Sequence, residues 1–329
     1  MADVIPITGP RHWAEAGQCR AMTVSGRRCR NRALDAEGYC RVHGAGPAPP
    51  AGREDRLEET LAWVRRRLTG DYEVDEFGFD PDLTEEVLSP LARVFHERWW
   101  RVDWIGLENV PSEGPALLVS NHAGTVPWDA VVLKFGVLDR HPAHRHVRLL
   151  AADLAFRLPF IGELARKSGN TLAGAEDAFR LLERGDLLGV FPEGYKGVGK
   201  RFKDRYKLQR FGRGGFIEVA LRARAPIVPV SIVGSEDIYP MIYNAKTVAR
   251  IAGFPYFPIT PFFPWLGPLG LIPLPSKWMI EFGPPIATDD FPDDAWQDPL
   301  TLFELTDRVR EEIQQTLYRN LMARRSVFF

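Results

Sequence analysis

Cysteine is scarce in this sequence of 329 residues: only three are present, all within the first 40 positions. An odd number of cysteines confined to one short stretch argues against a disulfide framework for the chain. An excess of charge of either sign is lacking too, because 42 Lys and Arg stand against 43 Asp and Glu. No nucleic-acid partner is therefore expected.

A targeting signal is also lacking from the first residues, Met-Ala-Asp-Val-Ile-Pro-Ile-Thr-Gly-Pro. No basic stretch followed by an apolar run occurs there, so no secretory signal is expected. The sequence accordingly predicts a cytoplasmic protein.

The three cysteines and a nearby histidine form a candidate metal site, made of Cys19, Cys29, Cys40 and His43. Three thiolates and one imidazole can complete a tetrahedral zinc shell with no open position, which favours a structural zinc ion. The alternative is three unrelated thiols. The run from about residue 17 to 43 also resembles a small cysteine-and-histidine module of unknown function. Residues 1–43 are thus predicted to be a zinc-binding module that can recruit a protein partner.

Composition divides the remaining chain into three parts. Residues 44–53 are rich in Pro and Gly and predict a semi-stiff linker. Residues 54–105 predict two amphipathic helices, over 56–68 and 83–100, and 106–329 form the main domain. In the second helix the predicted buried face comprises Val87, Leu91, Val94 and Phe95. Its neighbours Trp99, Trp100 and Trp104 are expected to pack on the core, with contact to a membrane interface as the alternative.

The main domain alternates short apolar runs with amphipathic stretches, which is typical of an α/β fold with a mixed sheet flanked by helices. One of these runs, 227–233, contains Pro229 and directly follows Pro226. The two prolines favour an edge strand or a bulge there. The predicted strands are 116–120, 147–152, 187–191, 227–233 and 278–282. The predicted helices are 175–184, 216–224, 302–325 and one that starts near residue 128.

His122 and Asp129 are the candidate catalytic pair. His122 directly follows a predicted buried strand, where active-site residues are often held between a rigid sheet and an exposed loop. A histidine can take a proton from a hydroxyl near neutral pH, and a carboxylate on its other ring nitrogen fixes the tautomer. Two residues at this spacing are weak support by themselves.

Two further blocks raise the specificity of the pattern. Phe-Pro-Glu-Gly occupies 191–194 and Pro-Ile-Val-Pro-Val occupies 226–230, each at a predicted strand. Together with Asn121-His122 through Asp129, and in this order, they resemble the glycerolipid acyltransferase family (PlsC-like, the lysophospholipid acyltransferase superfamily). The resemblance covers roughly residues 106–290.

The resemblance implies transfer of a fatty acyl group from acyl-CoA or acyl carrier protein to a hydroxyl of a glycerolipid or lysophospholipid. It implies that His122 is the general base, that Asp129 orients it, and that Glu193 and Gly194 help to hold the acceptor. Lys196 and Arg201 are expected to bind substrate. They belong to a basic cluster that can hold a phosphate or can simply be solvated: Lys196, Lys200, Arg201, Lys203, Arg205, Lys207, Arg210 and Arg213.

Two features depart from the family pattern. Six residues separate His122 from Asp129, whereas four are usual, although the branch resembling monoacylglycerol acyltransferases has longer spacings. Residues 168–174, where phosphatidic-acid-forming members have a basic residue, contain no arginine. A phosphorylated acceptor is therefore in doubt.

Residues 251–276 contain no charged side chain, but their seven prolines rule out a membrane-spanning helix. The segment either packs over the core or forms an apolar surface that dips into a bilayer and admits acyl chains. The second interpretation is favoured and predicts peripheral membrane association.

Two alternatives remain. The fold can serve as a scaffold for a non-catalytic lipid-binding or adaptor protein. His141, His144 and His146 can bind a metal, but neighbouring arginines would repel a cation, so a solvated connector is expected.

Overall fold

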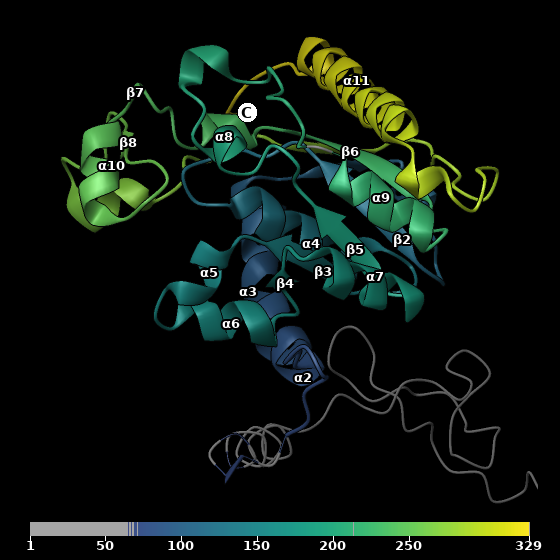
Figure 1. Ribbon diagram of the computed structural model, residues 1–329. Helices are drawn as coiled ribbons and strands as arrows, with labels where there is room; N and C mark the ends of the chain where they lie inside the picture. Colours follow the sequence, from purple (N-terminus) through teal and green to yellow (C-terminus); the bar gives the residue numbers. More distant parts are fainter. Residues whose placement is uncertain (1–64, 66, 68, 71, 213, 329) are drawn as a thin grey trace, which may run out of the picture. The chain divides into compact units, whose positions relative to one another are not determined.

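The computed structural model describes residues 65, 67, 69, 70, 72–212 and 214–328 (Figure 1). The chain divides into two units, Met1–Tyr72 and Glu73–Phe329, and the second contains the fold described below. The predicted zinc module, the linker and nearly all of the helix predicted at 56–68 lie outside the described residues.

A seven-stranded mixed sheet forms the centre of this unit, in the order β1-β9-β6-β2-β5-β3-β4. Neighbours are parallel except β6 and β9, which are antiparallel. The five predicted strands are confirmed to within one residue at either end, and two short strands, β1 and β4, were not predicted. The strands are β1 Asp103–Ile105, β2 Ala116–Ser120, β3 Val147–Ala151, β4 Thr171–Leu172, β5 Leu187–Val190, β6 Ile227–Val233 and β9 Met279–Phe282.

The position predicted for β6 was wrong, because this strand lies inside the sheet between β2 and β9. Pro229 is tolerated there because β9 has already ended at Phe282 where the proline faces it. The backbone of Gly283 donates to the carbonyl of Pro229 at 2.8 Å, so only an acceptor is needed at this position. Proline placement alone therefore does not identify an edge strand.

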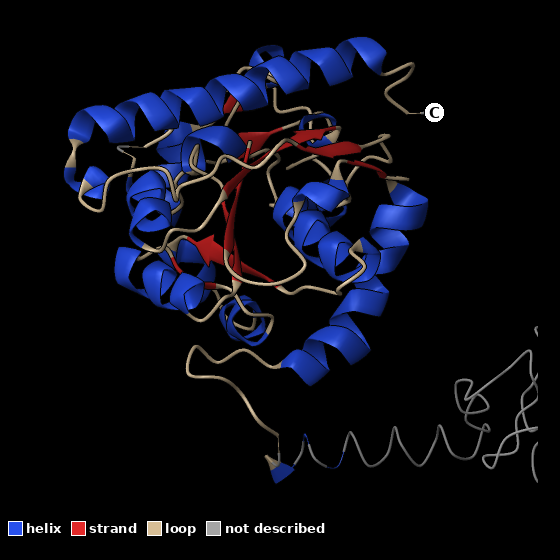
Figure 2. Ribbon diagram, turned by 90° about the vertical axis from the view of Figure 1, so that its right-hand side faces the viewer, coloured by secondary structure: helices blue, strands red, loops and turns tan. Residues whose placement is uncertain are grey.

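Helices cover both faces of the sheet, which gives three layers (Figure 2). Leu117 and Val119 of β2 pack toward α7, α9 and α11, whereas Leu118 packs toward α4. Both faces of β2 are thus buried, as its continuous apolar run predicts. The helices are α4 Trp128–Arg140, α5 Asp153–Arg157, α6 Ile161–Lys167, α7 Ala175–Glu183, α8 Tyr195–Val198, α9 Gly215–Arg222 and α11 Pro299–Ala323.

A helical run, Pro81–Trp99, packs beside α4. Its predicted buried face was wrong for Leu91 and Val94, which are exposed, whereas Val87 and Phe95 are half-buried. Asp139 of α4 accounts for the rotation. Its carboxylate accepts from Ser89 Oγ at 2.6 Å and lies 2.8 Å from His96 Nε2, so these polar side chains face inward. The run comprises α2 Pro81–Leu83, η2 Thr84–Leu88, α3 Ser89–Arg93 and η3 Val94–Trp99, with π-helical turns in η2 and η3.

The predicted packing of tryptophans on the core is confirmed for Trp100, which is fully buried and stacks on Trp278 with ring centroids 4.6 Å apart. The helical run and β1 belong to the same unit as the rest of the sheet, and β1 pairs with β9.

A small lobe stands at one side of the sheet, at the left of Figure 1, and is built from α10 Lys246–Ala252 and the two-stranded sheet of β7 Tyr243–Asn244 and β8 Pro258–Ile259. It continues into η7 Gly267–Leu271. No described helix has both the length and the apolar composition that crossing a bilayer requires.

Candidate active site

Three neighbouring strands, β5, β2 and β6, end at the same edge of the sheet and supply the polar residues of the site. His122 follows β2, Glu193 follows β5, and Glu236 follows β6 in the short helix η6 Ser235–Asp237. The side chain of Asn121 joins two of these ends: it donates to the carbonyl of Ile232 at 3.0 Å and accepts from its amide at 2.8 Å. Rigid strand ends of this kind are where α/β sheets hold their ligands.

His122 and Asp129 lie in direct contact, with 2.8 Å between His122 Nδ1 and Asp129 Oδ2. Asp129 is fully buried, and its oxygens also accept from the amides of Ala123 at 2.7 Å and Ala130 at 2.8 Å. A carboxylate has no proton to donate, so Nδ1–H of His122 is the donor. The His122 side chain is 15% exposed. The arrangement fixes the ring while leaving its other edge within reach of a ligand.

The six-residue loop between His122 and Asp129 closes without difficulty. Gly124 has a φ of 88°, a left-handed value that glycine adopts easily, and α4 begins immediately after Pro127. Asp129 therefore lies in the first turn of α4, where its carboxylate meets the start of the loop. The longer spacing therefore still brings the two side chains together.

The lobe reaches this loop through Tyr256, whose hydroxyl donates to the carbonyl of Thr125 at 2.5 Å. Burial, together with the nearby Asp129 and Tyr195, raises the pKa of Tyr256 to about 12. The hydroxyl therefore keeps its proton at neutral pH and remains a donor. The lobe and the His122 loop are thus joined by a hydrogen bond.

Glu193 supports His122 from the strand beside it. Its fully buried carboxylate accepts from the backbone amide of His122 at 2.9 Å and from the amide of Gln209 at 2.6 Å. The ring of Phe191, from the same block, lies 4.6 Å from the His122 ring. Both carboxylate oxygens are occupied by these internal bonds, so Glu193 holds the backbone of His122 in position. Contact between Glu193 and an acceptor stays a prediction.

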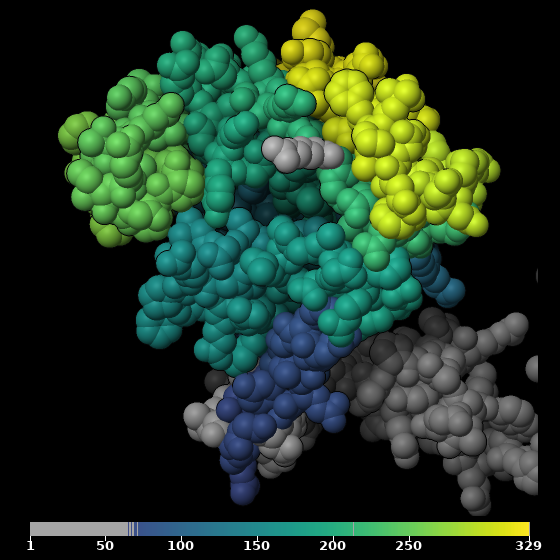
Figure 3. All heavy atoms as spheres, viewed as in Figure 1, coloured from purple at the N-terminus to yellow at the C-terminus, as the bar shows by residue number. Residues whose placement is uncertain are grey.

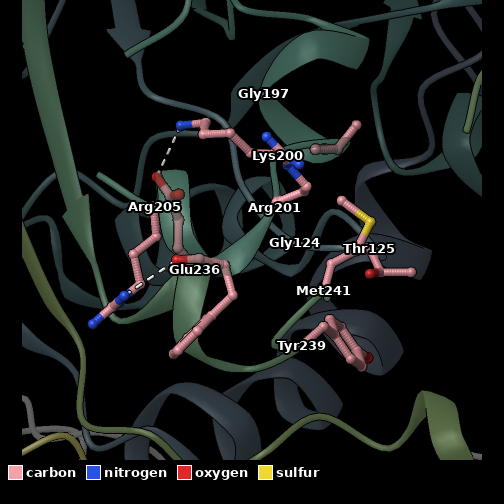
Figure 4. A pocket seen from close by; sticks show the side chains of 11 residues that line it. Gly124, Thr125, Gly197, Lys200, Arg201, Arg205, Glu236, Tyr239 and Met241 are labelled. Atoms are coloured by element: carbon pink, nitrogen blue, oxygen red, sulfur yellow. Dashed lines mark hydrogen bonds and ion pairs between the residues drawn. The ribbon is translucent and has the colours of Figure 1, made fainter. Parts of the chain in front are cut away.

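Lys200 and Glu236 complete a buried network with Glu193. Lys200 Nζ lies 3.2 Å from Glu193. It also lies 3.0 Å from Glu236, a contact that Figure 4 draws. Burial alone would lower the pKa of Lys200, but the carboxylates of Glu236 and Glu193 outweigh it and raise the pKa. Burial, reinforced by Glu193 and opposed by Lys200, raises the pKa of Glu236 to about 7. Lys200 is therefore not a solvated member of the basic cluster, which corrects that part of the prediction.

The remaining predicted substrate residues lie at the surface beside this network. Gly194 and Lys196 are exposed at α8, and Arg201 is exposed and pairs with Asp204 at 3.3 Å. Arg201 lines a small pocket, together with Gly124, Thr125, Gly197, Arg205 and Met241 (Figure 4). The pocket adjoins the His122 loop, so the structure brings Arg201 near the catalytic candidates. Binding of a phosphate group by the basic cluster stays a prediction.

The three histidines of the predicted connector bond to separate partners: His141 to the carbonyl of Val110, His144 to that of Leu138, and His146 to Glu85. Within the described part of the chain, no group of three or more His, Cys, Asp or Glu is arranged to hold a metal. The prediction of a solvated connector was wrong for His141, which is buried.

Glu236, Gln209 and Tyr256 were missed at the sequence level. A signal existed for Glu236, since Gly-Ser-Glu-Asp follows a predicted strand at 234–237 just as Asn-His follows another. Gln209 contributes only its backbone amide and Tyr256 only a hydroxyl from a distant lobe, so no local pattern marks either residue.

Comparison with known proteins places this geometry in context. The family model described as Acyltransferase matches residues 101–233, which include β2, His122, Asp129, Glu193 and β6. An uncharacterized protein of Mycobacterium tuberculosis is 61% identical over 282 residues, covering 86% of this chain and 79% of the relative. A protein of Mycobacterium leprae, also described as uncharacterized, is 56% identical over the same length.

More distant matches carry enzyme names. The chicken protein named DGAT1/2-independent enzyme synthesizing storage lipids is 27% identical over 227 residues, covering 68% of this chain and 62% of the relative. A solved structure, the 1-acyl-sn-glycerophosphate acyltransferase PlsC of Thermotoga maritima, aligns with a TM-score of 0.48 and 20% identity, covering 73% of this chain and 80% of that one.

A domain match that spans the strand ends and the His122–Asp129 pair defines the class: the protein is an acyltransferase. Within that class, the chain belongs to the same family as the two mycobacterial proteins, which are 61% and 56% identical to it over 282 residues.

Gly197 offers a test of how closely His122 must be held. A Cβ added there would lie 2.8 Å from the His122 carbonyl and 2.9 Å from its Cβ. We expect Gly197→Ala to displace His122, to lower acyl-transfer turnover roughly 10- to 100-fold, and to cost about 1–3 kcal/mol of unfolding free energy. Gly212→Ala is the control, because nothing lies within 4 Å of its added Cβ. Equal turnover in the two variants, measured beside urea denaturation, would contradict the expectation.

Proposed function

We propose that the protein transfers a fatty acyl group from an acyl thioester, acyl-CoA or acyl carrier protein, to a hydroxyl of a glycerolipid or lysophospholipid. In this proposal His122 is the general base and Asp129 its orienting partner. The observation that carries the proposal is the His122–Asp129 hydrogen bond of 2.8 Å at the end of β2. It occupies Nδ1 and therefore directs the basic Nε2 away from Asp129.

The geometry supports base catalysis on the substrate's own hydroxyl. Among the described residues, none forms a hydrogen bond with His122 Nε2, and the ring is partly exposed. A neutral imidazole with Nδ1–H bound to a carboxylate has its lone pair on Nε2, and the carboxylate stabilises the imidazolium that forms. Nε2 is thus ready to accept a proton from an acceptor hydroxyl.

The reaction then needs no covalent enzyme intermediate. Nε2 takes the hydroxyl proton while the acceptor oxygen attacks the thioester carbonyl carbon. The new C–O bond gives a tetrahedral intermediate, which collapses as the C–S bond breaks. The departing thiolate takes the proton from the imidazolium, so the products are the ester and the free thiol. General-base catalysis of this kind typically contributes roughly 100-fold to 10,000-fold.

Names of distant relatives support a lipid acceptor. The chicken relative is named as an enzyme that synthesizes storage lipids, and a more distant plant relative is named phytyl ester synthase. The loop 168–174 supports an acceptor without a phosphate group, since it contains no arginine. A neutral glyceride hydroxyl is therefore the preferred acceptor within the class.

The catalytic proposal is tested with His122→Ala and His144→Asn beside the wild type, using acyl-CoA and acyl carrier protein donors against a panel of lyso-lipids and glycerides. We expect His122→Ala to lower turnover roughly 100-fold to 10,000-fold because the base is lost. His144→Asn should match the wild type, because the ring of this exposed histidine bonds only to the carbonyl of Leu138. Equal rates in all three proteins, or no turnover in any, would instead support a non-catalytic scaffold.

A membrane partner follows from the same proposal. The lobe exposes large apolar side chains, among them Ile251 (84% exposed) and Trp265 (72%), and it projects from the body of the unit in Figure 3. No Asp or Glu occurs between Asp237 and Glu281, while Lys246 and Arg250 are exposed on α10. An apolar surface with basic edges suits an anionic bilayer. The bond from Tyr256 to Thr125 would place that bilayer next to the His122 loop.

Membrane attachment through the lobe predicts that Ile251→Asp combined with Trp265→Asp lowers binding to phosphatidylcholine–phosphatidylglycerol vesicles at least ~10-fold, since each buried apolar side chain contributes about 1.5–3 kcal/mol. Met322→Asp is the matched control, because Met322 is 88% exposed on α11, outside the lobe. Co-sedimentation measures the binding. Undiminished binding of the double variant would remove the lobe from the proposal.

The donor set of Cys19, Cys29, Cys40 and His43 supports a structural zinc ion in the first 43 residues, with no step of the reaction routed through it. Metal analysis of the full chain should find one zinc ion per molecule. Cys29→Ser or Cys40→Ser should release it without abolishing turnover. A full chain that contains no zinc and takes up none on addition would refute the module.

A further inference from the structure

Glu193, Lys200 and Glu236 form a buried triad that contacts the His122 backbone through Glu193. Their side chains are 0%, 5% and 4% exposed. Two carboxylates share one ammonium group, which lies 3.2 Å from Glu193 and 3.0 Å from Glu236. Buried charges without a nearby opposite charge are costly, so each member depends on the others.

The triad acts on the site through Glu193. Its two oxygens accept from the amides of His122 and Gln209. An ionised carboxylate accepts at both oxygens, whereas a protonated one carries a hydroxyl that donates instead. Burial favours the protonated form, and a cation in contact favours the ionised form. The ammonium of Lys200 therefore decides whether Glu193 can hold both amides at once.

We propose that Lys200 is a positioning residue for His122, which keeps Glu193 ionised so that its carboxylate fixes the backbone at the catalytic histidine, and that Glu236 holds Lys200 in place. The role in turnover rests on the proposed general-base function of His122. The role in fixing the backbone stands on the contacts of the triad alone. The two claims can therefore fail separately.

Other charged and titratable groups surround the triad and remain in every variant below. Asp129 binds the His122 ring, Arg201 and Arg205 line the pocket that Glu236 also lines, and Tyr206 and Asp237 lie beside Glu236. Of these, Asp237 pairs with Arg205 at 3.6 Å and with Arg324 at 2.5 Å. Lys200 is the cation in direct contact with Glu193.

Lys200→Met removes the cation and leaves two buried carboxylates together. Each then disfavours ionisation of the other, so Glu193 becomes protonated at a higher pH than in the wild type. We expect kcat at neutral pH to fall roughly 10- to 100-fold with little change in KM. The fall should be recovered as the pH is raised, because Glu193 ionises again. Lys200→Arg should retain most of the turnover.

The double variant Lys200→Met with Glu236→Gln leaves the net charge of the triad unchanged but still removes the contact with Glu193. Only one buried carboxylate then remains to be ionised. The acidic limb of its kcat profile should therefore lie between those of the wild type and Lys200→Met. It also serves as a second test if Lys200→Met folds poorly. If Lys200 merely stabilised the fold, its substitution would lower the yield of folded protein without shifting the acidic limb of the kcat profile.

Amide hydrogen exchange tests the fixing of the His122 backbone without any measurement of turnover. In Lys200→Met, and less so in the double variant, the amides of His122 and Gln209 should exchange faster at low pH and regain protection as the pH rises, after correction for the intrinsic exchange rate. The amide of Ile232, bound to Asn121, is the internal reference. Arg148→Met is the control for loss of a buried cation, because Arg148 is 2% exposed and pairs with Asp75 at 2.7 Å.

The outcomes separate cleanly. Absence of turnover in the wild type, with pH-dependent exchange at His122 and Gln209 in Lys200→Met, would sink the proposed reaction and keep the positioning role. Unchanged exchange and an unshifted pH profile in Lys200→Met and in the double variant, both folded, would overturn the positioning role. A shift as large in Arg148→Met would do the same, because it would show a general effect of lost buried charge.

Discussion

The hydrogen bond between the His122 ring and the buried carboxylate of Asp129 is the interaction on which the site depends. It determines which ring nitrogen carries the proton, and therefore which one can accept another. Two backbone amides, from Ala123 and Ala130, hold the carboxylate in turn. The first turn of α4 and the end of β2 are thus fixed to each other through one side chain. A loop of unusual length can be accommodated because its two ends are held in this way.

The sheet explains why these groups meet. Three adjacent strands deliver His122, Glu193 and Glu236 to one edge, and the side chain of Asn121 joins two of the strand ends. Helices on both faces bury the strands, so the edge has a rigid base. Acyl transfer depends more on accurate placement of its two substrates than on an unusual reactive group in the protein. A stiff sheet edge beside an apolar lobe meets that need for a lipid substrate.

Much of this was predictable from the sequence, because the buried strands form continuous apolar runs and the motif blocks lie at their ends. The failures have physical causes. β6 was placed at an edge because proline lacks a donor, yet Pro229 faces a neighbour that needs only its carbonyl. The buried face of the helical run at Pro81–Trp99 was misplaced because Asp139 draws Ser89 and His96 inward. Lys200 was grouped with surface cations because its burial depends on two carboxylates, Glu193 and Glu236, which follow different strands and meet only in the folded sheet.

The most direct measurement of the central claim is the ¹⁵N chemical shift of the His122 ring in protein labelled at histidine, at a pH where the ring is neutral. The mechanism predicts a proton on Nδ1 and an unprotonated Nε2, with this preference lost in Asp129→Asn. A proton on Nε2 in the wild-type protein would contradict it, because the nitrogen that faces the substrate could not then act as the base.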